Sequence, residues 1–150
     1  MPNRRSTPAV TTYHVLLVED NPGDADLVRL ALSECRAEVS VVVADNAVRA
    51  FEYLKGQPPY GSNRPPDLIL LDLALPVIHG HKVLDVIKHN EAWRRIPVLV
   101  LSSSAASRDR ILCERLGACA FIAKPIDWPG YLALADRLRQ MLVEGCLQRD

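Results

Sequence analysis

The sequence predicts a doubly wound α/β domain, in which a single parallel sheet carries helices on both faces. Short apolar runs alternate five times with segments whose apolar residues recur at helical spacing. Several of these runs are apolar at successive positions, as in strands that are buried on both faces. Strands linked through helices run parallel, and right-handed crossovers distribute the helices over both faces of the sheet.

The first strand is expected over residues 13–19, a short apolar run that ends in an acid. The pair Asn21-Pro22 then starts a helix, with Asn21 or Asp24 as its cap and Pro22 in the first turn. Apolar residues at helical spacing continue this helix to about Arg36.

The middle of the chain supplies two further strands and one helix. Residues 39–44 are β-branched and predict a strand, 47–55 predict a helix, and 67–71 predict the next strand. Four prolines and two glycines over 56–66 exclude regular structure and predict a loop.

The last part of the chain repeats the pattern, with Gly117 closing a helix. Its expected elements are a helix through 83–87, a strand over 96–101, a helix over 108–116, a strand over 119–123 and a helix over 128–143.

The 150 residues suit one domain. Eighteen basic and eighteen acidic residues give no net charge, and no cationic run could follow phosphates, so nucleic-acid binding is not expected. No apolar stretch follows Arg4 and Arg5 before the first strand, which argues against a signal peptide or membrane anchor. We expect a flexible arm over 1–12, the domain over 13–145 and a tail over 146–150.

The cysteines are expected to be reduced and mostly buried, which indicates a cytoplasmic protein. They show no C-x-x-C spacing, and each lies in or beside an apolar pattern. Metal sites need paired spacings, and a chain of this size needs no disulfide, so both roles are disfavoured. The four residues are Cys35, Cys113, Cys119 and Cys146.

Chemically active residues follow the predicted strands, at the edge where such sheets bind ligands. Glu19 and Asp20 follow the first strand, Asp72 the third, Ser102 the fourth and Lys124 the fifth. Crowded carboxylates at neutral pH either hold a proton or bind a divalent cation. Oxygen ligands without His or Cys favour Mg²⁺.

This set suits phosphoryl transfer, in which a protein mainly positions groups and neutralises charge. Asp72 is a competent nucleophile toward phosphorus. A metal on Glu19 and Asp20 would screen the donor's charge, Lys124 would add a point charge, and Ser102 could donate a hydrogen bond to a phosphoryl oxygen.

Structural alternatives exist for the same residues. Asp72 alone could be a turn former, and Glu19 and Asp20 could cap the first helix. Ser102 begins a run of three serines, so only its spacing singles it out. Lys124 could be a solvated surface lysine, although its place after an apolar run disfavours this.

Taken together and in order, these motifs resemble those of response-regulator receiver domains over roughly residues 13–143. Asp72 precedes Ser102 by 30 residues, and Ser102 precedes Lys124 by 22, as the receiver pattern expects. The resemblance implies a flavodoxin-like sheet of strand order 2-1-3-4-5. The matching motifs are Val18-Glu19-Asp20-Asn21, Leu71-Asp72-Leu73, Leu75-Pro76, Ser102 and Lys124-Pro125.

The resemblance further implies that Asp72 accepts a phosphoryl group from a phosphohistidine of a sensor histidine kinase. Glu19, Asp20, Asp72 and the backbone carbonyl of Ala74 would lie at the Mg²⁺. Such a protein phosphorylates itself with Mg²⁺ and loses the group by itself, and it is not a turnover enzyme.

Ser102 and Phe121 would form the switch pair of such a receiver, in a two-state population shift. Phe121 is nearly as well explained as plain core. The resemblance also implies a cis bond before Pro125.

The sequence departs from the receiver pattern beside the site. Ala74 replaces a residue that is usually polar or larger, and His79 stands where receivers often carry Asp. Small residues at Ala74 and Ser104 leave the phosphoryl lifetime undetermined. His79 and His81 are titratable, although a surface turn explains them better than a pH or metal role.

A narrower resemblance is to single-domain receivers paired with bacterial phytochromes, which would make the partner a light-sensing kinase. It is carried by residues 19–26, the proline-rich loop and residues 93–97.

The last helix has apolar residues over roughly 200° of its circumference, more than one sheet face needs. We expect a homodimer through the fourth helix, fifth strand and fifth helix, with a tail from Gly145 folding back as the alternative. The apolar residues are Tyr131, Leu132, Leu134, Ala135, Leu138, Met141, Leu142 and Val143.

We expect this receiver to signal by protein contact, since too few residues follow Val143 for an output domain. One rival is a phosphohydrolase with an Asp nucleophile, but such enzymes place a second acid where this chain has Ala74. The other rival is a pseudo-receiver scaffold that needs no phosphorylation.

Overall fold

The computed structural model describes residues 12–35, 38–56, 65–103 and 106–145. Its strands are β2 (Thr12–Val18), β3 (Glu38–Ala44), β4 (Leu68–Asp72), β5 (Val98–Ser102) and β6 (Ala120–Ala123). Its helices are α1 (Pro22–Ser33), α2 (Ala47–Lys55), α3 (Gly80–Lys88), α4 (Ser107–Leu116) and α5 (Trp128–Glu144).

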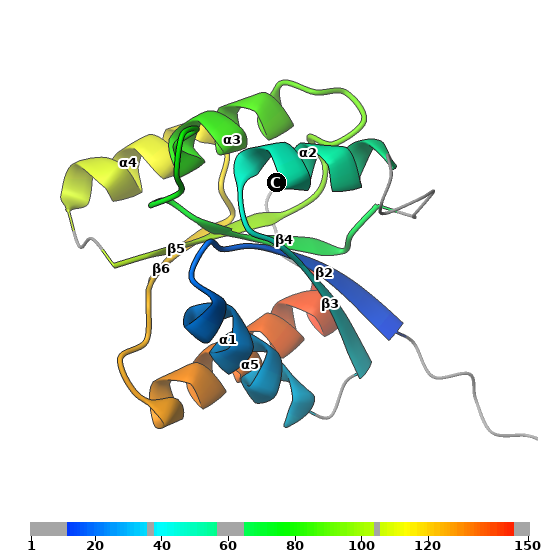
Figure 1. The fold of residues 1–150 in the computed structure, drawn as a ribbon, viewed down its shortest axis with the longest axis vertical. Helices are drawn as coiled ribbons and strands as arrows, with labels where there is room; N and C mark the ends of the chain where they lie inside the picture. Colours follow the sequence, from blue (N-terminus) through cyan, green and yellow to red (C-terminus); the bar gives the residue numbers. More distant parts are fainter. Residues whose placement is uncertain (1–11, 36–37, 57–64, 104–105, 146–150) are drawn as a thin grey trace, which may run out of the picture.

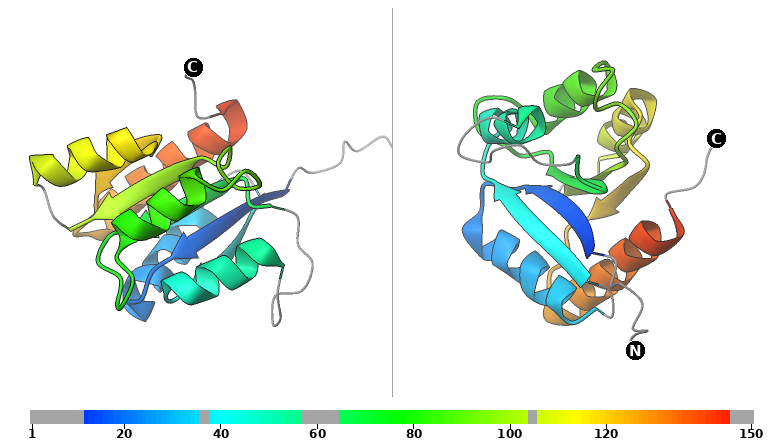
Figure 2. Two further views of the ribbon diagram at one scale, coloured as in Figure 1. Left: turned by 90° about the horizontal axis from the view of Figure 1, so that it is seen from above. Right: turned by 90° about the vertical axis from the view of Figure 1, so that its right-hand side faces the viewer.

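These elements form a five-stranded sheet between two layers of helices. The strand order is β3-β2-β4-β5-β6 with all pairs parallel, which confirms the predicted order 2-1-3-4-5. Helices α1 and α5 cover one face, and α2, α3 and α4 cover the other (Figure 1; side view in Figure 2). The predicted doubly wound fold is therefore correct.

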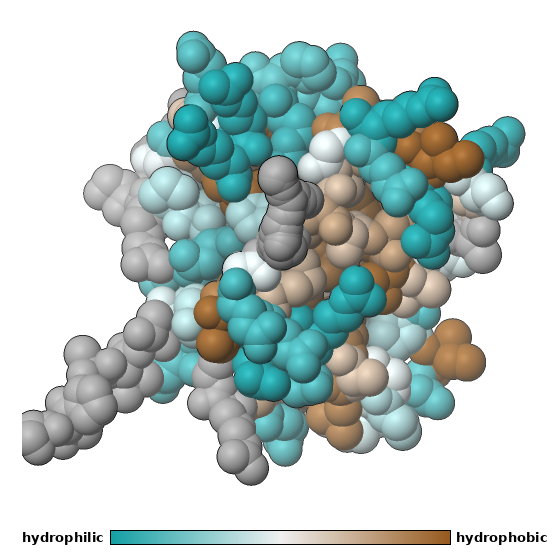
Figure 3. Space-filling view, turned by 180° about the vertical axis from the view of Figure 1, so that it is seen from behind, coloured by the Kyte–Doolittle hydropathy of each residue, from teal (hydrophilic) through white to brown (hydrophobic). Residues whose placement is uncertain are grey.

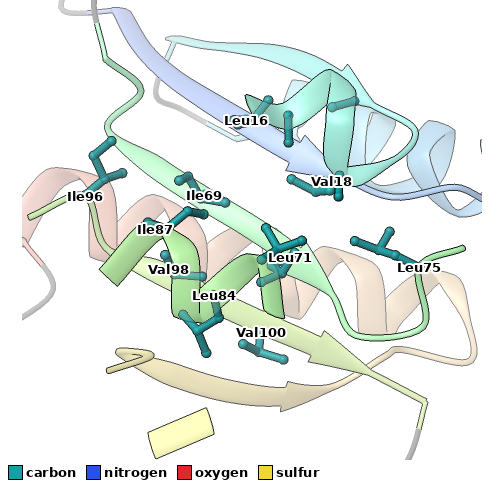
Figure 4. Close-up of a cluster of buried hydrophobic side chains, with 14 of the residues drawn as sticks. Leu16, Val18, Ile69, Leu71, Leu75, Leu84, Ile87, Ile96, Val98 and Val100 are labelled. Atoms are coloured by element: carbon teal, nitrogen blue, oxygen red, sulfur yellow. The ribbon is translucent and has the colours of Figure 1, made fainter. Parts of the chain in front are cut away.

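Two apolar clusters hold the layers together, because successive residues of a buried strand point to opposite faces. The cluster beneath α2, α3 and α4 includes Leu16, Val18, Ile69, Leu71, Val98 and Val100 (Figure 4). The cluster beneath α1 and α5 includes Val15, Leu17, Leu68, Leu70, Leu99 and Leu101.

Several boundaries differ from those expected. The strands predicted to end at Leu71 and Leu101 each extend one residue further, so Asp72 and Ser102 are their last residues. The first helix ends at Ser33 instead of near Arg36, which lies outside the described residues. Cys35 continues the apolar spacing but lies in the turn that follows, where its thiol donates to the Ala135 carbonyl.

The loop between β4 and α3 is tightly packed against the strand end. Val77 adopts a φ of 65°, which is strained for a β-branched residue, and its side chain is fully exposed. A Cβ on Gly80 would come within 2.6 Å of both the Asp72 carbonyl oxygen and the Leu73 Cα. Only glycine lets α3 begin this close to the end of β4.

The three described cysteines are free thiols, and one of them is buried, fewer than the mostly buried set that was expected. Cys113 is buried, and burial raises the pKa of its thiol to about 11, which keeps it protonated. Cys35 and Cys119 are half-buried, and Cys146 lies outside the described residues, as do the predicted arm up to residue 11 and the tail over 146–150.

No helix in the described part of the chain has both the length and the apolar character needed to cross a bilayer.

Gly80→Ala is expected to destabilise the fold by about 1–3 kcal/mol, because the new methyl group would meet backbone atoms that cannot move aside. Urea unfolding measures the change. Gly23→Ala is the matched control, since its Cβ would meet only a side-chain oxygen of Asn21, at 3.2 Å. An unchanged free energy of unfolding for Gly80→Ala would contradict this packing.

Candidate functional site

Three carboxylates meet at the carboxyl edge of the sheet. Strands β2 and β4 pair in parallel with Val18 opposite Leu71, so Glu19 and Asp20 leave β2 next to Asp72 at the end of β4. One oxygen from each of the three carboxylates lies within 4.8 Å of the others. The structure thus brings together the acids that the sequence predicted.

Lys124 reaches this cluster from the segment after β6. Its Nζ lies 2.9 Å from Glu19 Oε1, 2.9 Å from Asp24 Oδ2 and 3.3 Å from Asp72 Oδ2. The backbone N–H of Lys124 donates to the Ser102 carbonyl at 2.9 Å, which fixes the start of the side chain. Lys124 is therefore part of the site and is not a solvated surface lysine.

Burial and neighbouring charges raise the pKa of both Glu19 and Lys124, which favours the neutral form of the acid and the charged form of the amine. Burial raises the pKa of Glu19 to about 7, with Lys124 opposing the rise and Asp72 adding to it. Burial alone would lower the pKa of the Lys124 amine, but the carboxylates of Glu19, Asp24 and Asp72 outweigh it and raise that pKa. Lys124 is a fixed positive charge, whereas Glu19 titrates near neutrality.

Backbone N–H groups hold the two buried acids in place. Asp72 is 2% exposed, and its Oδ1 accepts a hydrogen bond from the Ala74 N–H at 3.2 Å. Glu19 Oε2 accepts from the Asn21 N–H at 3.2 Å. Glu19 Oε1 is within ion-pair distance of Lys124 but accepts no hydrogen bond among the described residues. Glu19 and Asp20 line a cavity of about 490 Å³.

Helix α1 is capped by Asn21 and not by Glu19 or Asp20. Asn21 is the cap, since its side-chain oxygen accepts from the Asp24 N–H at 3.0 Å. This leaves the carboxylate of Asp24 free to contact Lys124, a role that the sequence analysis did not assign to it. The only signal for it was its place in the acidic segment after the first strand.

Ser102 and Phe121 lie on the opposite face of the sheet from Asp72. Ser102 follows Val98 and Val100 on the side of α4, and Phe121 pairs in register with Val100 on that same side. Both are buried, and the Arg110 guanidinium of α4 lies 5.0 Å from the centre of the Phe121 ring. Phe121 is thus part of the core in this structure, and its switching role stays a prediction.

The two histidines lie at the start of α3. Their rings stack with centres 6.1 Å apart, and His81 Nε2 lies 3.6 Å from Asp109 Oδ1 of α4. His79 precedes α3 without a side-chain capping bond. The cis geometry expected before Pro125 stays a prediction, and Ser104 lies outside the described residues.

Comparison with known proteins agrees with this site. A family model described as the response regulator receiver domain matches residues 15–135. The two-component response regulator ORR1 of Oryza sativa subsp. japonica is 36% identical over 115 residues, which are 75% of this chain and 49% of the rice protein. This chain thus matches about half the length of that relative. Response regulator Rcp1 of Synechocystis sp. is 36% identical over 110 residues, 73% of this chain and 75% of Rcp1.

Solved structures give the same result. The phosphorylated cyanobacterial phytochrome response regulator RcpA has a TM-score of 0.82 and 32% identity, covering 89% of this chain and 95% of RcpA. The Mn²⁺-bound form of Rcp1 has a TM-score of 0.80 and 29% identity, covering 92% of this chain and 99% of Rcp1. With a family match over residues 15–135 and the expected acids, hydroxyl and lysine at one edge of the sheet, the chain belongs to the response regulator receiver domain family.

Proposed function

We propose that this protein accepts a phosphoryl group on Asp72 from a phosphohistidine of a sensor histidine kinase and then signals by protein contact. The observation that carries the proposal is the buried Asp72 carboxylate, which lies beside two other acids and Lys124 at the carboxyl edge of the sheet. A carboxylate in such a place is a nucleophile that the protein has already positioned.

In the transfer, an Asp72 carboxylate oxygen forms a bond to phosphorus while the bond between phosphorus and the histidine nitrogen breaks. The imidazole leaves with the electron pair and takes up a proton. Lys124 holds positive charge 3.3 Å from Asp72 Oδ2, where the phosphoryl oxygens would bring their negative charge. Its raised pKa keeps it charged throughout.

The residues present fit a divalent cation. Glu19, Asp20 and Asp72 would hold it, together with the Ala74 carbonyl, and Glu19 Oε1 is a buried oxygen that accepts no hydrogen bond among the described residues. All-oxygen ligands favour Mg²⁺, and the similarity to Mn²⁺-bound Rcp1 supports a divalent ion. When bound, the ion supplies neutralisation of negative charge on the phosphoryl oxygens.

We infer that the kinase is of the phytochrome type and that the pair acts in the cytoplasm. Support comes from the similarity to RcpA, which is named a cyanobacterial phytochrome response regulator, and to the response regulator Rcp1. Phosphorylation of Asp72 would act on the switch pair Ser102 and Phe121 from the neighbouring strand, because Ser102 ends β5, which pairs with β4.

The proposed dimer surface combines α4, β6 and α5. On α5, the buried residues Tyr131, Leu134, Ala135 and Leu138 belong to the core, and Leu132 and Val143 are the exposed ones among the eight apolar residues. The side of β6 and α5 shows an apolar band between hydrophilic regions (Figure 3). Exposed large apolar residues on α4 and α5 are Ile111, Leu112, Trp128, Leu132 and Val143.

The rival functions are less well supported. Ala74 puts a methyl group where an Asp-nucleophile phosphohydrolase needs its second acid, so we propose a phosphoacceptor and not a turnover enzyme. A scaffold that needs no phosphorylation would not require three carboxylates around one lysine ammonium.

Incubation with Mg²⁺ and acetyl phosphate is expected to add one phosphoryl group to the protein, observed as intact mass. Asp72→Asn should abolish the adduct because the amide is not a nucleophile toward phosphorus. Continuous release of phosphate from small phosphoesters without an adduct would favour a hydrolase. No reaction at all would favour the scaffold.

Mg²⁺ affinity is expected to be roughly tenfold weaker at pH 6 than at pH 8, because Glu19, with a pKa of about 7, must lose its proton to bind the ion. Calorimetric titration measures it, and Glu19→Gln should remove most of the pH dependence. Without metal, Glu19 has the opposite pH dependence in folding. Its contribution to the free energy of unfolding falls as the pH rises from 4.5 to about 7, because the unfolded chain loses this proton at lower pH than the folded chain. Equal affinities at the two pH values would contradict the raised pKa.

Leu132→Glu is expected to convert a dimer to monomer in sedimentation velocity, tested with and without acetyl phosphate. A buried carboxylate at the contact would lose its hydration. Leu30→Glu on α1 is the matched control, because Leu30 is 56% exposed and lies on another helix. A monomeric wild-type protein under both conditions would rule out this surface as a dimer contact.

A further inference from the structure

We propose that Asp24 is a positioning residue that holds the Lys124 ammonium at the solvent side of the acidic cluster, so that Glu19 and Asp72 stay open to a divalent cation. This inference rests on the proposed function, because metal binding at the cluster is part of it.

Asp24 is a partner of the lysine and not a member of the metal cluster. Its Oδ2 accepts a hydrogen bond from Lys124 Nζ at 2.9 Å, closer than the 3.3 Å contact with Asp72. The described residues whose carboxylates gather closely enough for one ion are Glu19, Asp20 and Asp72, without Asp24. Asp24 therefore binds the lysine, while the other three acids form the candidate metal site.

The three partners of Lys124 differ in their burial. The side chains of Glu19 and Asp72 are 1% and 3% exposed, whereas that of Asp24 is 32% exposed. Asp24 is thus the partner on the solvent side, and it comes from α1 while the others come from strand ends.

The lysine and a divalent cation compete for the same oxygens. Both are positive, and Lys124 lies close to one oxygen of Glu19 and one of Asp72, which are groups that the ion needs. An ammonium has three donors, so a lysine anchored on Asp24 can release one of the buried carboxylates without losing all of its charge partners. A lysine without Asp24 would have only the buried acids to pair with, and the ion would have to displace it.

The start of α1 holds Asp24 in place. The Asn21 side chain accepts the Asp24 N–H at 3.0 Å, which fixes the backbone of the first helical turn. Lys124 is equally fixed through its own N–H on the Ser102 carbonyl. A contact between two anchored residues 100 positions apart in the chain is a property of the fold.

The test is the Mg²⁺ affinity of Asp24→Asn, measured by calorimetric titration of the full chain at pH 8. We expect affinity to fall about tenfold, as for the loss of an outer-shell partner at a metal site. Asp26→Asn is the matched control, because Asp26 lies on the same helix, is exposed and has no ion-pair partner among the described residues. It should change affinity by no more than about twofold.

Two further variants separate positioning from a general loss of charge or of folding. Asp24→Glu keeps the carboxylate and should recover most of the affinity, which also tests the idea if Asp24→Asn does not fold. In a Lys124→Met background, Asp24→Asn should have no further effect, because its action passes through the lysine.

Wild-type affinity in Asp24→Asn, or an equal loss with and without Lys124, would overturn the inference. Failure of the proposed function is a different result, namely that the wild-type protein forms no adduct on Asp72 with acetyl phosphate.

Discussion

The site depends on one lysine ammonium that is shared by three carboxylates. Lys124 lies within 3.3 Å of oxygens of Glu19, Asp24 and Asp72, and two of these acids are almost completely buried. Buried carboxylates persist only when a cation or a proton compensates them. The raised pKa of Glu19 means that one lysine compensates incompletely. A cluster with surplus negative charge is suited to take up a divalent ion and, with it, a phosphoryl group.

Parallel pairing of β2 with β4 brings these carboxylates together. It aligns the ends of the two strands, so the acids that follow each of them must lie side by side. The tight start of α3 at Gly80 then closes the loop over the end of β4. Apolar packing on both faces of the sheet stabilises the fold, and this stability offsets the repulsion between the neighbouring carboxylates.

The sheet also separates the chemistry from the surface that would respond to it. Asp72 continues the face of α1 and α5, while Ser102 and Phe121 lie on the face of α4. β4 and β5 are neighbours, so Asp72 and Leu101 pair directly while Ser102, one residue on, points the other way. Under the proposed function, a phosphoryl group on Asp72 would therefore act on Ser102, the last residue of the neighbouring strand.

The sequence by itself determined the fold class, the order of the elements and the residues at the strand ends, because hydrophobic period, capping and turn residues are local properties. Strand ends were uncertain by a residue, since a polar residue such as Asp72 can end a strand as well as follow it. Only the tertiary structure decided that Asp24 contacts Lys124 and that Arg110 lies over Phe121. Such contacts depend on how helices settle on the sheet, and residues 100 positions apart carry no shared pattern that would reveal their distance.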